Sequence, residues 1–496
     1  MFATDLAAFN GSVVATFLIY LLAMFAIGYW AWRSTSDSAD YFLGGRSLSP
    51  WPAALSAGAS DMSGWLLLGL PGYAYMAGLE ASWIALGLLI GTWANWQFLA
   101  ARLRDFTERY QDSLTIPQYL SNRFHDSKRL LQGVSALFIL LFFLFYTSAG
   151  LVAGGKLFNT VFGLPYQWAV VLGCLCIVGY TFFGGFLAVA WTDLVQGLLM
   201  AAALVIVPVI GWQSLSSGLS SQLDEINPAL LNAFSGSDGQ PLGWIALVSS
   251  LAWGLGYFGQ PHILTRFAAI RSVADVPAAR RIAVTWSALT MISALAVGLV
   301  GVALTRSQGV VIADAETIFM VLVNTLFHPI VAGILLAAIL AAIMSTADSQ
   351  LLVCSSALAE DLYKQFVHTR ASNNHVLWVS RLSVALVALV ATWLAMDDSS
   401  SVLGLVSYAW AGFGAAFGPV LLFSVYWRRS TFAGALAAIV TGGVTVVVWA
   451  QLQGGVFDLY ELLPGFVLAS LVMLLVSSVT QPPQLGEADD FAMAGD

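Results

Sequence analysis

Charged residues are scarce in this sequence. Only 9% of the 496 residues are Asp, Glu, Lys or Arg, whereas 59% are hydrophobic and the mean hydropathy is +0.82. A soluble domain usually carries about 25% charged residues. Because a chain this long and this poor in charge cannot cover a water-facing surface, the composition excludes a soluble enzyme and indicates a membrane domain.

Basic residues and cysteines are few as well. With 19 Lys and Arg and a net charge of −8, the chain lacks the material for a clustered basic face, so we expect no nucleic-acid partner. Its three cysteines, Cys174, Cys176 and Cys354, lie inside apolar runs and predict small buried side chains rather than disulfides. No basic residue precedes Arg33, so the first apolar run is expected to be a retained span and not a cleaved signal peptide.

Long apolar runs dominate the rest of the chain. A helix needs about 20 apolar residues to cross the hydrocarbon core of a bilayer. On this basis we predict an all-α integral membrane protein with a single transmembrane domain over 13–480, an external N-terminus at 1–12 and a disordered, acidic cytoplasmic tail at 481–496. We expect thirteen spans, at 13–33, 51–78, 82–103, 129–161, 165–186, 189–215, 243–268, 280–305, 316–353, 376–396, 401–427, 431–451 and 462–480.

The basic residues divide unevenly between the two sides of these spans. All of the 19 Lys and Arg except Lys156 and Arg306 fall on one side, which the positive-inside rule assigns to the cytoplasm. An odd number of spans then places the N-terminus outside and the C-terminus inside. This assignment puts Arg266 at the cytoplasmic end of its span and leaves no Lys or Arg at mid-membrane depth.

The span around SAGASDMSGWLLLGLPG (56–72) is unusual because it combines Asp61 with several serines and glycines. Glycine lowers helix propensity by about 1 kcal/mol relative to alanine, and an Asp at the bilayer centre costs about 2.5–3.5 kcal/mol. A broken helix whose backbone lines a cavity would compensate for both. We therefore expect Asp61 to face the bundle interior and meet a cation, the alternative being a structural Asp that accepts bonds from neighbouring backbone amides.

A second unusual span, SSLAWGLGYFGQPHILTRF (249–267), holds three glycines followed by Pro261, which removes a backbone donor and kinks a helix. Two interrupted spans in matching halves of a chain indicate a transporter binding site, although glycines that serve packing alone would also explain this one. These are spans 2 and 7, and an odd offset of five spans inverts the second copy. We predict inverted five-helix repeats at about 51–215 and 243–427, with extra helices at 13–33, 431–451 and 462–480.

A third feature is the small-residue run LLAAILAAIMSTADSQLL (335–352). Small residues let another helix approach closely, and Ser345 and Thr346 supply two adjacent hydroxyl oxygens. Hard cations take oxygen ligands, and a broken span 2 would offer free carbonyls opposite the hydroxyls. We expect one Na⁺ to bind there, the alternative being hydroxyls that bond back to carbonyls of their own helix.

Without a mid-membrane Lys or Arg, a substrate carboxylate would have to be held by backbone N–H groups at the ends of half-helices. Aromatic rings near the breaks could receive an apolar body and a cationic ammonium group, although each could equally serve packing. This chemistry favours a small zwitterion with an apolar skeleton over a sugar. The rings in question are Trp65, Tyr146, Trp253, Tyr257 and Phe258.

Taken together, five motifs resemble the sodium/solute symporter family: GASDMSGWLLLGLPG, AVAWTDLVQ (188–196), WGLGYFGQPHIL (253–264), MSTADSQLL (344–352) and GLVSYAWAGFGAAFGP (404–419). The resemblance runs from about residue 13 to 480. It implies a secondary active symporter of the bacterial cytoplasmic membrane that imports L-proline with Na⁺ by alternating access. Another small amino acid or organic solute, coupled to Na⁺ or H⁺, is the alternative.

The resemblance also implies roles for particular residues. It implies one Na⁺ held by the carbonyls of Ala59, Met62 and Ala342 and the hydroxyls of Ser345 and Thr346. Asp61, Ser63 and Gly64 match positions important for Na⁺ and substrate, while Trp65, Tyr146, Trp253, Tyr257 and Pro261 match positions tied to proline. Arg46 matches a cytoplasmic-side position tied to coupling, and Asp193 an acidic position on the inner Na⁺ pathway. Asp348 is expected to serve a gate or packing and not the sodium site.

Other functional classes fit the sequence less well. An enzyme within the membrane would need His or carboxylate side chains gathered in one place, and His262 and His328 are far apart in the sequence. A fused sensor would need a further domain, for which the 16 residues after 480 leave no room. We expect membrane lipid and a small molecule as partners and no obligate protein partner. The pair Gly414–Gly418 fits packing inside the bundle better than a dimer face.

Overall fold

The computed structural model of the chain describes residues 11–32, 43–181 and 185–481. Those residues form helices and loops without a named strand, and ten helices are long and apolar enough to span a membrane. The predicted all-α, multi-pass architecture is therefore confirmed. The predicted acidic tail beyond residue 481, residues 1–10 of the predicted external N-terminus and Arg33 lie outside the described residues.

The helices of the first half follow the predicted spans closely, with short 3₁₀ (η1, η3, η5) and π (η2, η4) segments between them. They are α1 (Gly11–Trp32), η1 (Gly44–Arg46), α3 (Pro50–Asp61), η2 (Trp65–Gly69), α4 (Leu70–Ala77), η3 (Gly78–Ala81), α5 (Ser82–Ala94), η4 (Asn95–Ala100), α6 (Ala101–Arg109), α7 (Ile116–Arg123), α8 (Leu130–Phe162), α9 (Tyr166–Thr181), α10 (Phe186–Gln213), α11 (Leu219–Ile226) and η5 (Pro228–Leu231).

The second half contains the remaining helices. They are α12 (Trp244–Ala252), the 3₁₀ segment η6 (Trp253–Gly259), α13 (Pro261–Ala269), η7 (Val273–Asp275), α14 (Val276–Ser307), η8 (Ala315–Thr317), α15 (Ile318–Leu326), α16 (Pro329–Ser356), the π-helix η9 (Ala357–Val367), α17 (Asn373–Leu394), α18 (Val402–Tyr426), α19 (Phe432–Trp449), η10 (Gly455–Asp458) and α20 (Leu462–Val479).

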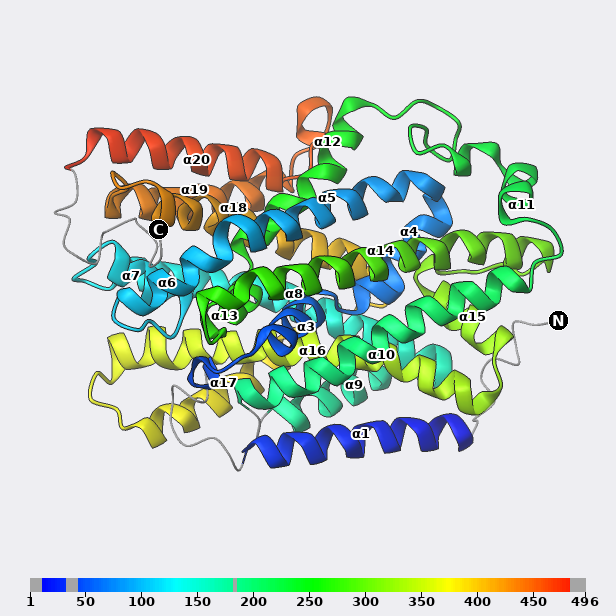
Figure 1. Ribbon diagram of the computed structural model, residues 1–496, viewed down its shortest axis with the longest axis horizontal. Helices are drawn as coiled ribbons and strands as arrows, with labels where there is room; N and C mark the ends of the chain where they lie inside the picture. The colour runs from blue at the N-terminus through cyan, green and yellow to red at the C-terminus, as the bar shows by residue number, and fades with distance from the viewer. Residues whose placement is uncertain (1–10, 33–42, 182–184, 482–496) are drawn as a thin grey trace.

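Most of the long helices lie side by side along the long axis of the molecule (Figure 1). The interrupted helix α3 packs against α10, α14, α13 and α16, while α8 packs against α16 and α18. Inside this core α3 is buried from Pro52 to Asp61, which is possible because the segment is built from small residues. At the edges, α1 and α20 expose large apolar side chains such as Leu22 and Leu475, as expected of helices that face lipid.

The backbone leaves the helical conformation just after Asp61. Met62 has φ −85° and ψ 77°, and the π-helix η2 starts three residues later at Trp65. Two hydrogen bonds are rerouted as a result, because Ser63 N donates to the Asp61 carbonyl and Leu66 N to the Ser63 carbonyl, both at 3.0 Å. In an uninterrupted helix these two donors would bond the carbonyls of Ala59 and Met62. The interruption therefore frees two backbone oxygens inside the protein.

A second change of conformation separates α12 from α13. The tight 3₁₀ turns of η6 end at Gln260, whose φ of −80° and ψ of 105° are extended, and α13 begins at Pro261. Proline favours this first helical position because its missing N–H would have no partner there, and it disfavours the helical conformation for the residue before it. The glycines of η6 let α5 approach, since a Cβ atom on Gly254 would lie 2.2 Å from the Gly87 carbonyl oxygen.

The predicted span 316–353 is two helices in the structure. α15 ends at Leu326, Phe327 and His328 are extended, and α16 starts at Pro329. The cause is the His-Pro pair, since proline disfavours the helical conformation for the residue before it. His328, which the sequence placed inside a span, is exposed and caps α16 by accepting the N–H of Ile330.

We expect Gly254→Ala to destabilise the contact between α5 and η6. The added methyl group would overlap the Gly87 carbonyl, and overpacking of this kind costs about 1–3 kcal/mol. Thermal unfolding of the detergent-purified protein should show a lower midpoint. The matched control is Gly243→Ala, because no atom lies within 4 Å of a Cβ there. Equal midpoints for the two variants would contradict the proposed close approach.

Candidate functional site

Asp61 lies at the first interruption and is enclosed by protein. Its carboxylate Oδ2 accepts a hydrogen bond from the Tyr257 hydroxyl at 2.6 Å, and its backbone carbonyl accepts bonds from the Tyr146 hydroxyl and the Trp65 indole N–H, both at 3.0 Å. The other carboxylate oxygen, Oδ1, is buried and has no hydrogen-bond partner among the described residues. Asp61 thus joins α3 to η6 through its carboxylate and to α8 through its backbone carbonyl, and the partner of its side chain is a distant tyrosine rather than a neighbouring backbone amide.

The freed carbonyl of Ala59 is contacted by two adjacent hydroxyls of the small-residue helix α16. Ser345 Oγ lies 2.9 Å and Thr346 Oγ1 3.2 Å from this oxygen, and Ser345 Oγ is also 3.2 Å from the Ala342 carbonyl. The hydroxyls therefore reach across to another helix and do not bond only within their own. These neutral oxygens, buried and within hydrogen-bond distance of one another, are the ligand type that hard cations take.

Met62 contributes the second freed carbonyl. Its backbone departs from the helix one residue after Asp61, and its sulfur lies 3.5 Å from the Thr290 hydroxyl of α14. Ser63 and Gly64 form the rest of the interruption: Trp65 N lies 3.4 Å from Ser63 Oγ, and a Cβ on Gly64 would meet the Ala153 methyl of α8 at 2.6 Å. Gly64 is thus a position of close approach between α3 and α8.

The candidate aromatic residues fall into two groups. Trp65, Tyr146 and Tyr257 converge on Asp61, as described. Trp253 instead stacks on Tyr460 with ring centroids 5.2 Å apart, while its carbonyl accepts the indole N–H of a tryptophan on α18. Phe258, the remaining aromatic candidate, packs beside Gly418 of α18. The structure therefore brings three of the predicted rings together at Asp61 and places Trp253 and Phe258 in packing contacts with other elements.

Two polar residues beside the second interruption were not among the sequence-based candidates. Gln260 donates to the carbonyls of Gly256 and Trp410, at 3.0 and 3.2 Å, and its Oε1 is buried without a partner within the described chain. His262 packs edge-on against Tyr146, with ring centroids 5.8 Å apart. Neither of its ring nitrogens has a hydrogen-bond partner among the residues that the structure describes. The sequence signal was the Gln-Pro-His triplet that directly follows the last glycine of η6.

Asp193 lies in a buried polar network rather than alone. Its Oδ2 accepts bonds from Ser56 Oγ at 2.6 Å and from the Arg266 guanidinium at 3.1 Å. Arg266 also donates to Ser349 Oγ at 2.5 Å, and this hydroxyl bonds the Ser345 carbonyl at 2.9 Å. The network therefore connects Asp193 with the α16 helix that carries the two hydroxyls.

From the sequence we expected Arg266 at the cytoplasmic end of its span and did not predict its ion pair with Asp193. The side chain is only 1% exposed and bridges α13 to α3, α10 and α16. A buried guanidinium is tolerated here because Asp193 balances its charge and its donors are matched by acceptors. Asp348 is also fully buried and contacts Ser349 at 3.4 Å, next to the network rather than among the oxygens around Ala59.

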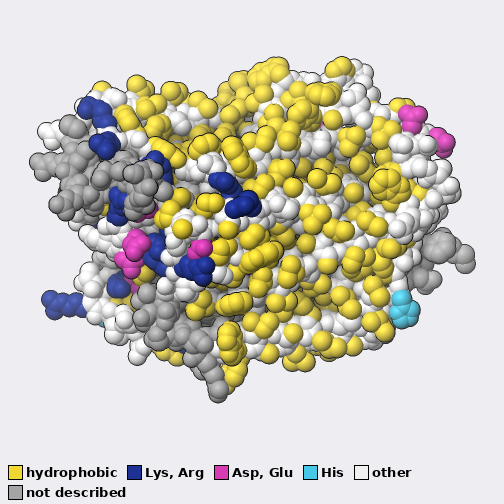
Figure 2. All heavy atoms as spheres, viewed as in Figure 1, with side chains coloured by type: hydrophobic (Ala, Val, Ile, Leu, Met, Phe, Trp, Pro, Cys, Tyr) yellow, Lys and Arg dark blue, Asp and Glu magenta, His cyan; other side chains and the backbone are white. Residues whose placement is uncertain are grey.

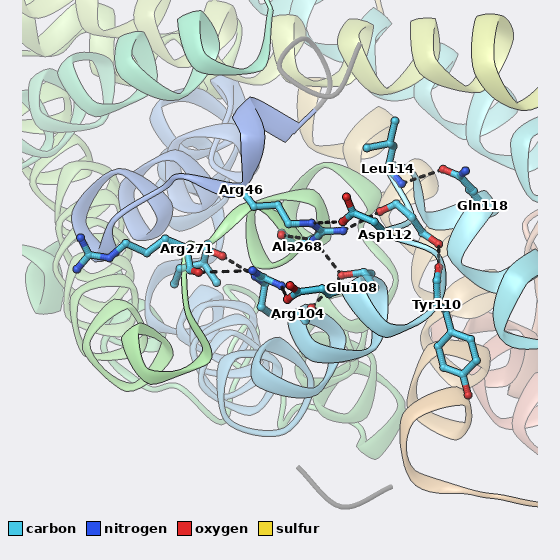
Figure 3. Close-up of polar contacts among 12 residues, drawn as sticks. Arg46, Arg104, Glu108, Tyr110, Asp112, Leu114, Gln118, Ala268 and Arg271 are labelled. Carbon is cyan, nitrogen blue, oxygen red and sulfur yellow. Dashed lines mark hydrogen bonds and ion pairs between the residues drawn. The ribbon is translucent and has the colours of Figure 1, made fainter. Parts of the chain in front are cut away.

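Arg46, the residue predicted to affect coupling, holds a loop against the end of α13 (Figure 3). Its guanidinium pairs with Asp112 at 2.7 Å and donates to Thr107 Oγ1 and to the carbonyls of Ala268 and Ser113 at 3.1, 2.5 and 3.1 Å. Burial lowers the pKa of the Arg46 guanidinium, and the neighbouring Asp112 carboxylate opposes this shift. The side chain thus fixes the α6–α7 loop to the C-terminus of the second interrupted helix.

Arg104 of α6 completes this contact from the other side (Figure 3). It donates to the carbonyls of Ile270 and Arg271 at 2.6 and 3.5 Å and pairs with Glu108 at 2.5 Å. Two arginines therefore bond carbonyls in the last turn of α13 and just beyond it, where positive charge also interacts favourably with the helix dipole.

Residues 41–442 match the profile of the sodium:solute symporter family. The chain belongs to this family. Among curated proteins, this family member is 49% identical to the "Sodium/proline symporter" of Salmonella typhimurium, over 98% of this chain and 97% of the relative. It is 48% identical to the "High-affinity proline transporter PutP" of Bacillus subtilis, over 94% of this chain and 98% of the relative.

Solved structures share the fold of this sodium:solute symporter family member. A substrate-bound, outward-open Na⁺-coupled sialic acid symporter superposes with a TM-score of 0.80 at 20% identity, covering 96% of this chain and all of the other. Mhp1, a nucleobase-cation-symport-1 family transporter, gives a TM-score of 0.55 at 16% identity and covers 92% of this chain and 97% of its own. At these identities the likeness shows the common architecture alone.

We expect the bond between Tyr257 and Asp61 to appear as a coupling energy in a double-mutant cycle. Tyr257→Phe leaves the buried carboxylate without its donor and should cost about 1–3 kcal/mol of unfolding free energy. The same change should cost clearly less in an Asp61→Ala background, because the acceptor is then already absent. The measurement is denaturant unfolding of the four purified variants, and simple additivity would contradict the contact.

Proposed function

We propose that this protein is a secondary active symporter that imports L-proline together with Na⁺ and has no catalytic role. The observation that carries the proposal is the contact of Ser345 and Thr346 with the freed Ala59 carbonyl, two residues from Asp61. Family membership and the proline-transport names of relatives 48–49% identical over nearly the whole chain support the same function. Membrane lipid is the expected surrounding, in a bacterial cytoplasmic membrane.

We propose thirteen spans for the described chain. The continuous segment Trp65–Arg109 has 45 residues, about 68 Å of helix, which is too long for one crossing and turns at η3. Its first part completes the span begun by α3, and the shorter apolar helices Tyr166–Gly179 and Trp244–Gly259 supply two more crossings. We propose inverted repeats at about 51–215 and 243–427, with spans 2 and 7 interrupted.

We propose that the end of the molecule carrying α6 and α7 faces the cytoplasm. Lys and Arg side chains gather toward this end in Figure 2, which agrees with the positive-inside rule. Lys156, one of the two basic residues assigned to the external side, pairs with Asp314 and Glu316, which the span count places on that same side. The N-terminus is then external and the C-terminus cytoplasmic.

In this proposal Na⁺ is held by the carbonyls of Ala59, Met62 and Ala342 and the hydroxyls of Ser345 and Thr346. The ion would replace the two hydroxyl bonds to the Ala59 carbonyl as the link between α3 and α16. Since α3 also ends in Asp61, ordering this segment would favour substrate binding, and linkage makes the effect reciprocal. The potential supplies about 2.3 kcal/mol per 100 mV and each tenfold Na⁺ gradient about 1.4 kcal/mol.

We propose that proline binds at the convergence of the two interruptions. The unpartnered Asp61 Oδ1 suits the secondary ammonium group, and the rings of Trp65, Tyr146 and Tyr257 suit the pyrrolidine. The substrate carboxylate would be met by the backbone N–H of Gly64, since the N–H of Ser63 already donates to the Asp61 carbonyl. Pro261 and the more distant Trp253 and Phe258 would shape the site through the position of η6.

Asp193 would act on the inner Na⁺ pathway, and Arg46 would affect coupling by fixing the end of α13.

We expect proteoliposomes of the purified protein to accumulate L-proline when an inward Na⁺ gradient is imposed. Ser345→Ala and Thr346→Val should each weaken the Na⁺ dependence of uptake at least about tenfold, because each removes an oxygen ligand. Ser355→Ala is the matched control. Among the described residues, the buried Ser355 hydroxyl donates only to the Leu352 carbonyl of the same helix. Uptake at the same rate without Na⁺ would disprove the coupling, and a competition panel of amino acids would reveal a different substrate.

The proposed orientation predicts opposite labelling of two exposed positions in a variant without native cysteines. Val311, 91% exposed between α14 and η8, is assigned to the outside, and Val367, 72% exposed at the end of η9, to the cytoplasm. A membrane-impermeant maleimide should label Val311→Cys in intact cells and Val367→Cys in inside-out vesicles. The reverse labelling pattern would contradict the proposed orientation of the protein in the membrane.

A further inference from the structure

A small cavity lies along α13, between Pro261 and the segment that leads into α7. Its walls include Thr265 and Arg266 of α13 and Ser356 at the end of α16, and residues Leu114–Pro117 close one side. Since Pro261 directly follows the interruption at Gln260, the cavity begins next to the proposed substrate site. Its other end meets the loop that Arg46 holds, on the side proposed as cytoplasmic.

The closing segment is attached to the opposite wall through Asp361. This side chain of η9 is 1% exposed, and its Oδ1 accepts bonds from the Thr115 hydroxyl at 2.9 Å and from Gln132 Nε2 of α8 at 2.7 Å. The same Thr115 hydroxyl oxygen accepts the N–H of Gln118, so it caps α7 while it donates to Asp361. Asp361 Oδ2, in contrast, is buried and has no hydrogen-bond partner within the described chain.

The other end of the segment is held by Arg46. The guanidinium pairs with Asp112 and donates to the Ser113 carbonyl, two residues before Thr115. Asn122 of α7 bonds Ser113 Oγ at 3.0 Å and adds a further restraint (Figure 3 shows Arg46 beside Asp112). Residues 112–117 are thus a short strap, fixed by Arg46 toward α13 and by Asp361 toward η9.

We propose that residues 112–117 plug the solute exit on the cytoplasmic side, and that the hydrogen bond between Thr115 and Asp361 is the latch that holds the plug closed. The proposal rests on the transport function proposed above. The latch residues come from opposite halves of the chain, since Thr115 follows span 3 and Asp361 follows span 9 on η9. Widening the cavity between α13 and η9 therefore requires this bond to break.

The chemistry of the latch suits a contact that opens and closes. A buried carboxylate oxygen without a partner raises the free energy of the closed state, whereas water entering an open exit would solvate it. The bonds from Thr115 and Gln132 oppose this tendency. Gln132 belongs to α8, and Asp361 belongs to η9, which packs against α8. Of these two bonds to Asp361, only the one from Thr115 therefore crosses to the plug. Removing this single hydroxyl should shift the balance toward the open form.

The test uses cysteine accessibility in inside-out vesicles. The reporter is Ser356→Cys, a small change at the cavity wall, in a variant whose three native cysteines are replaced. With Na⁺ present and proline absent, we expect a membrane-impermeant maleimide to label this cysteine about tenfold faster when Thr115→Val is added, the effect of losing one bond to a buried carboxylate. Asp361→Ala should act in the same direction, and Thr115→Ser, which keeps the hydroxyl, should not.

The matched control is Thr325→Val, because the Thr325 hydroxyl of α15 donates only to the Val321 carbonyl of its own helix. An unchanged labelling rate in both Thr115→Val and Asp361→Ala would overturn the latch, and so would an equal increase in Thr325→Val or an increase seen only with reagent on the external face. The readout does not depend on proline transport. If purified protein failed to transport proline while labelling still rose, the proposed function would fail and the latch would stand.

Discussion

The structure depends on one constraint: backbone groups released by two interrupted helices must find partners inside a largely apolar bundle. Unsatisfied polar groups in such an environment cost several kcal/mol each, so the interruptions can exist only where other elements complete them. The Ala59 carbonyl is met by hydroxyls of α16, and the Asp61 carbonyl by Tyr146 and Trp65. The candidate site therefore arises because other elements supply hydrogen-bond partners for the backbone groups freed after Asp61.

Much of this could be predicted from the sequence because the signals are local. The combination of Asp61 with serine and glycine neighbours marks the segment where the backbone leaves the helical conformation at Met62, and the glycines before Pro261 mark the change at Gln260. That these are the broken spans of two repeats stays a prediction. The adjacent hydroxyls of Ser345 and Thr346 stood out within an otherwise apolar run. Each signal lies within a few residues, and propensity and hydropathy act at this range.

What the sequence did not predict depends on contacts between distant segments. Arg266 and Asp193 are 73 positions apart, and nothing local shows that the guanidinium turns inward. For the same reason the sequence could not separate Trp253, which stacks on Tyr460, from Trp65, which bonds Asp61. The division at Pro329 was visible as a proline, but the apolar run continues on both sides and hydropathy alone joined the two helices.

The helix α16 and its continuation η9 connect the two ends of the proposed mechanism. Ser345 and Thr346 lie on α16, and one turn later the Ser349 hydroxyl accepts a hydrogen bond from the Arg266 guanidinium. Asp361 lies on η9. From Ser345 to Asp361 the helical segment is unbroken and about 24 Å long. A rigid element of this kind cannot shift at the proposed cation site without shifting at the proposed plug. In this proposal the neutral oxygens around Ala59 and the carboxylate that holds Thr115 are mechanically linked, so that an ion bound at the proposed site would influence whether the proposed exit beside α7 is closed.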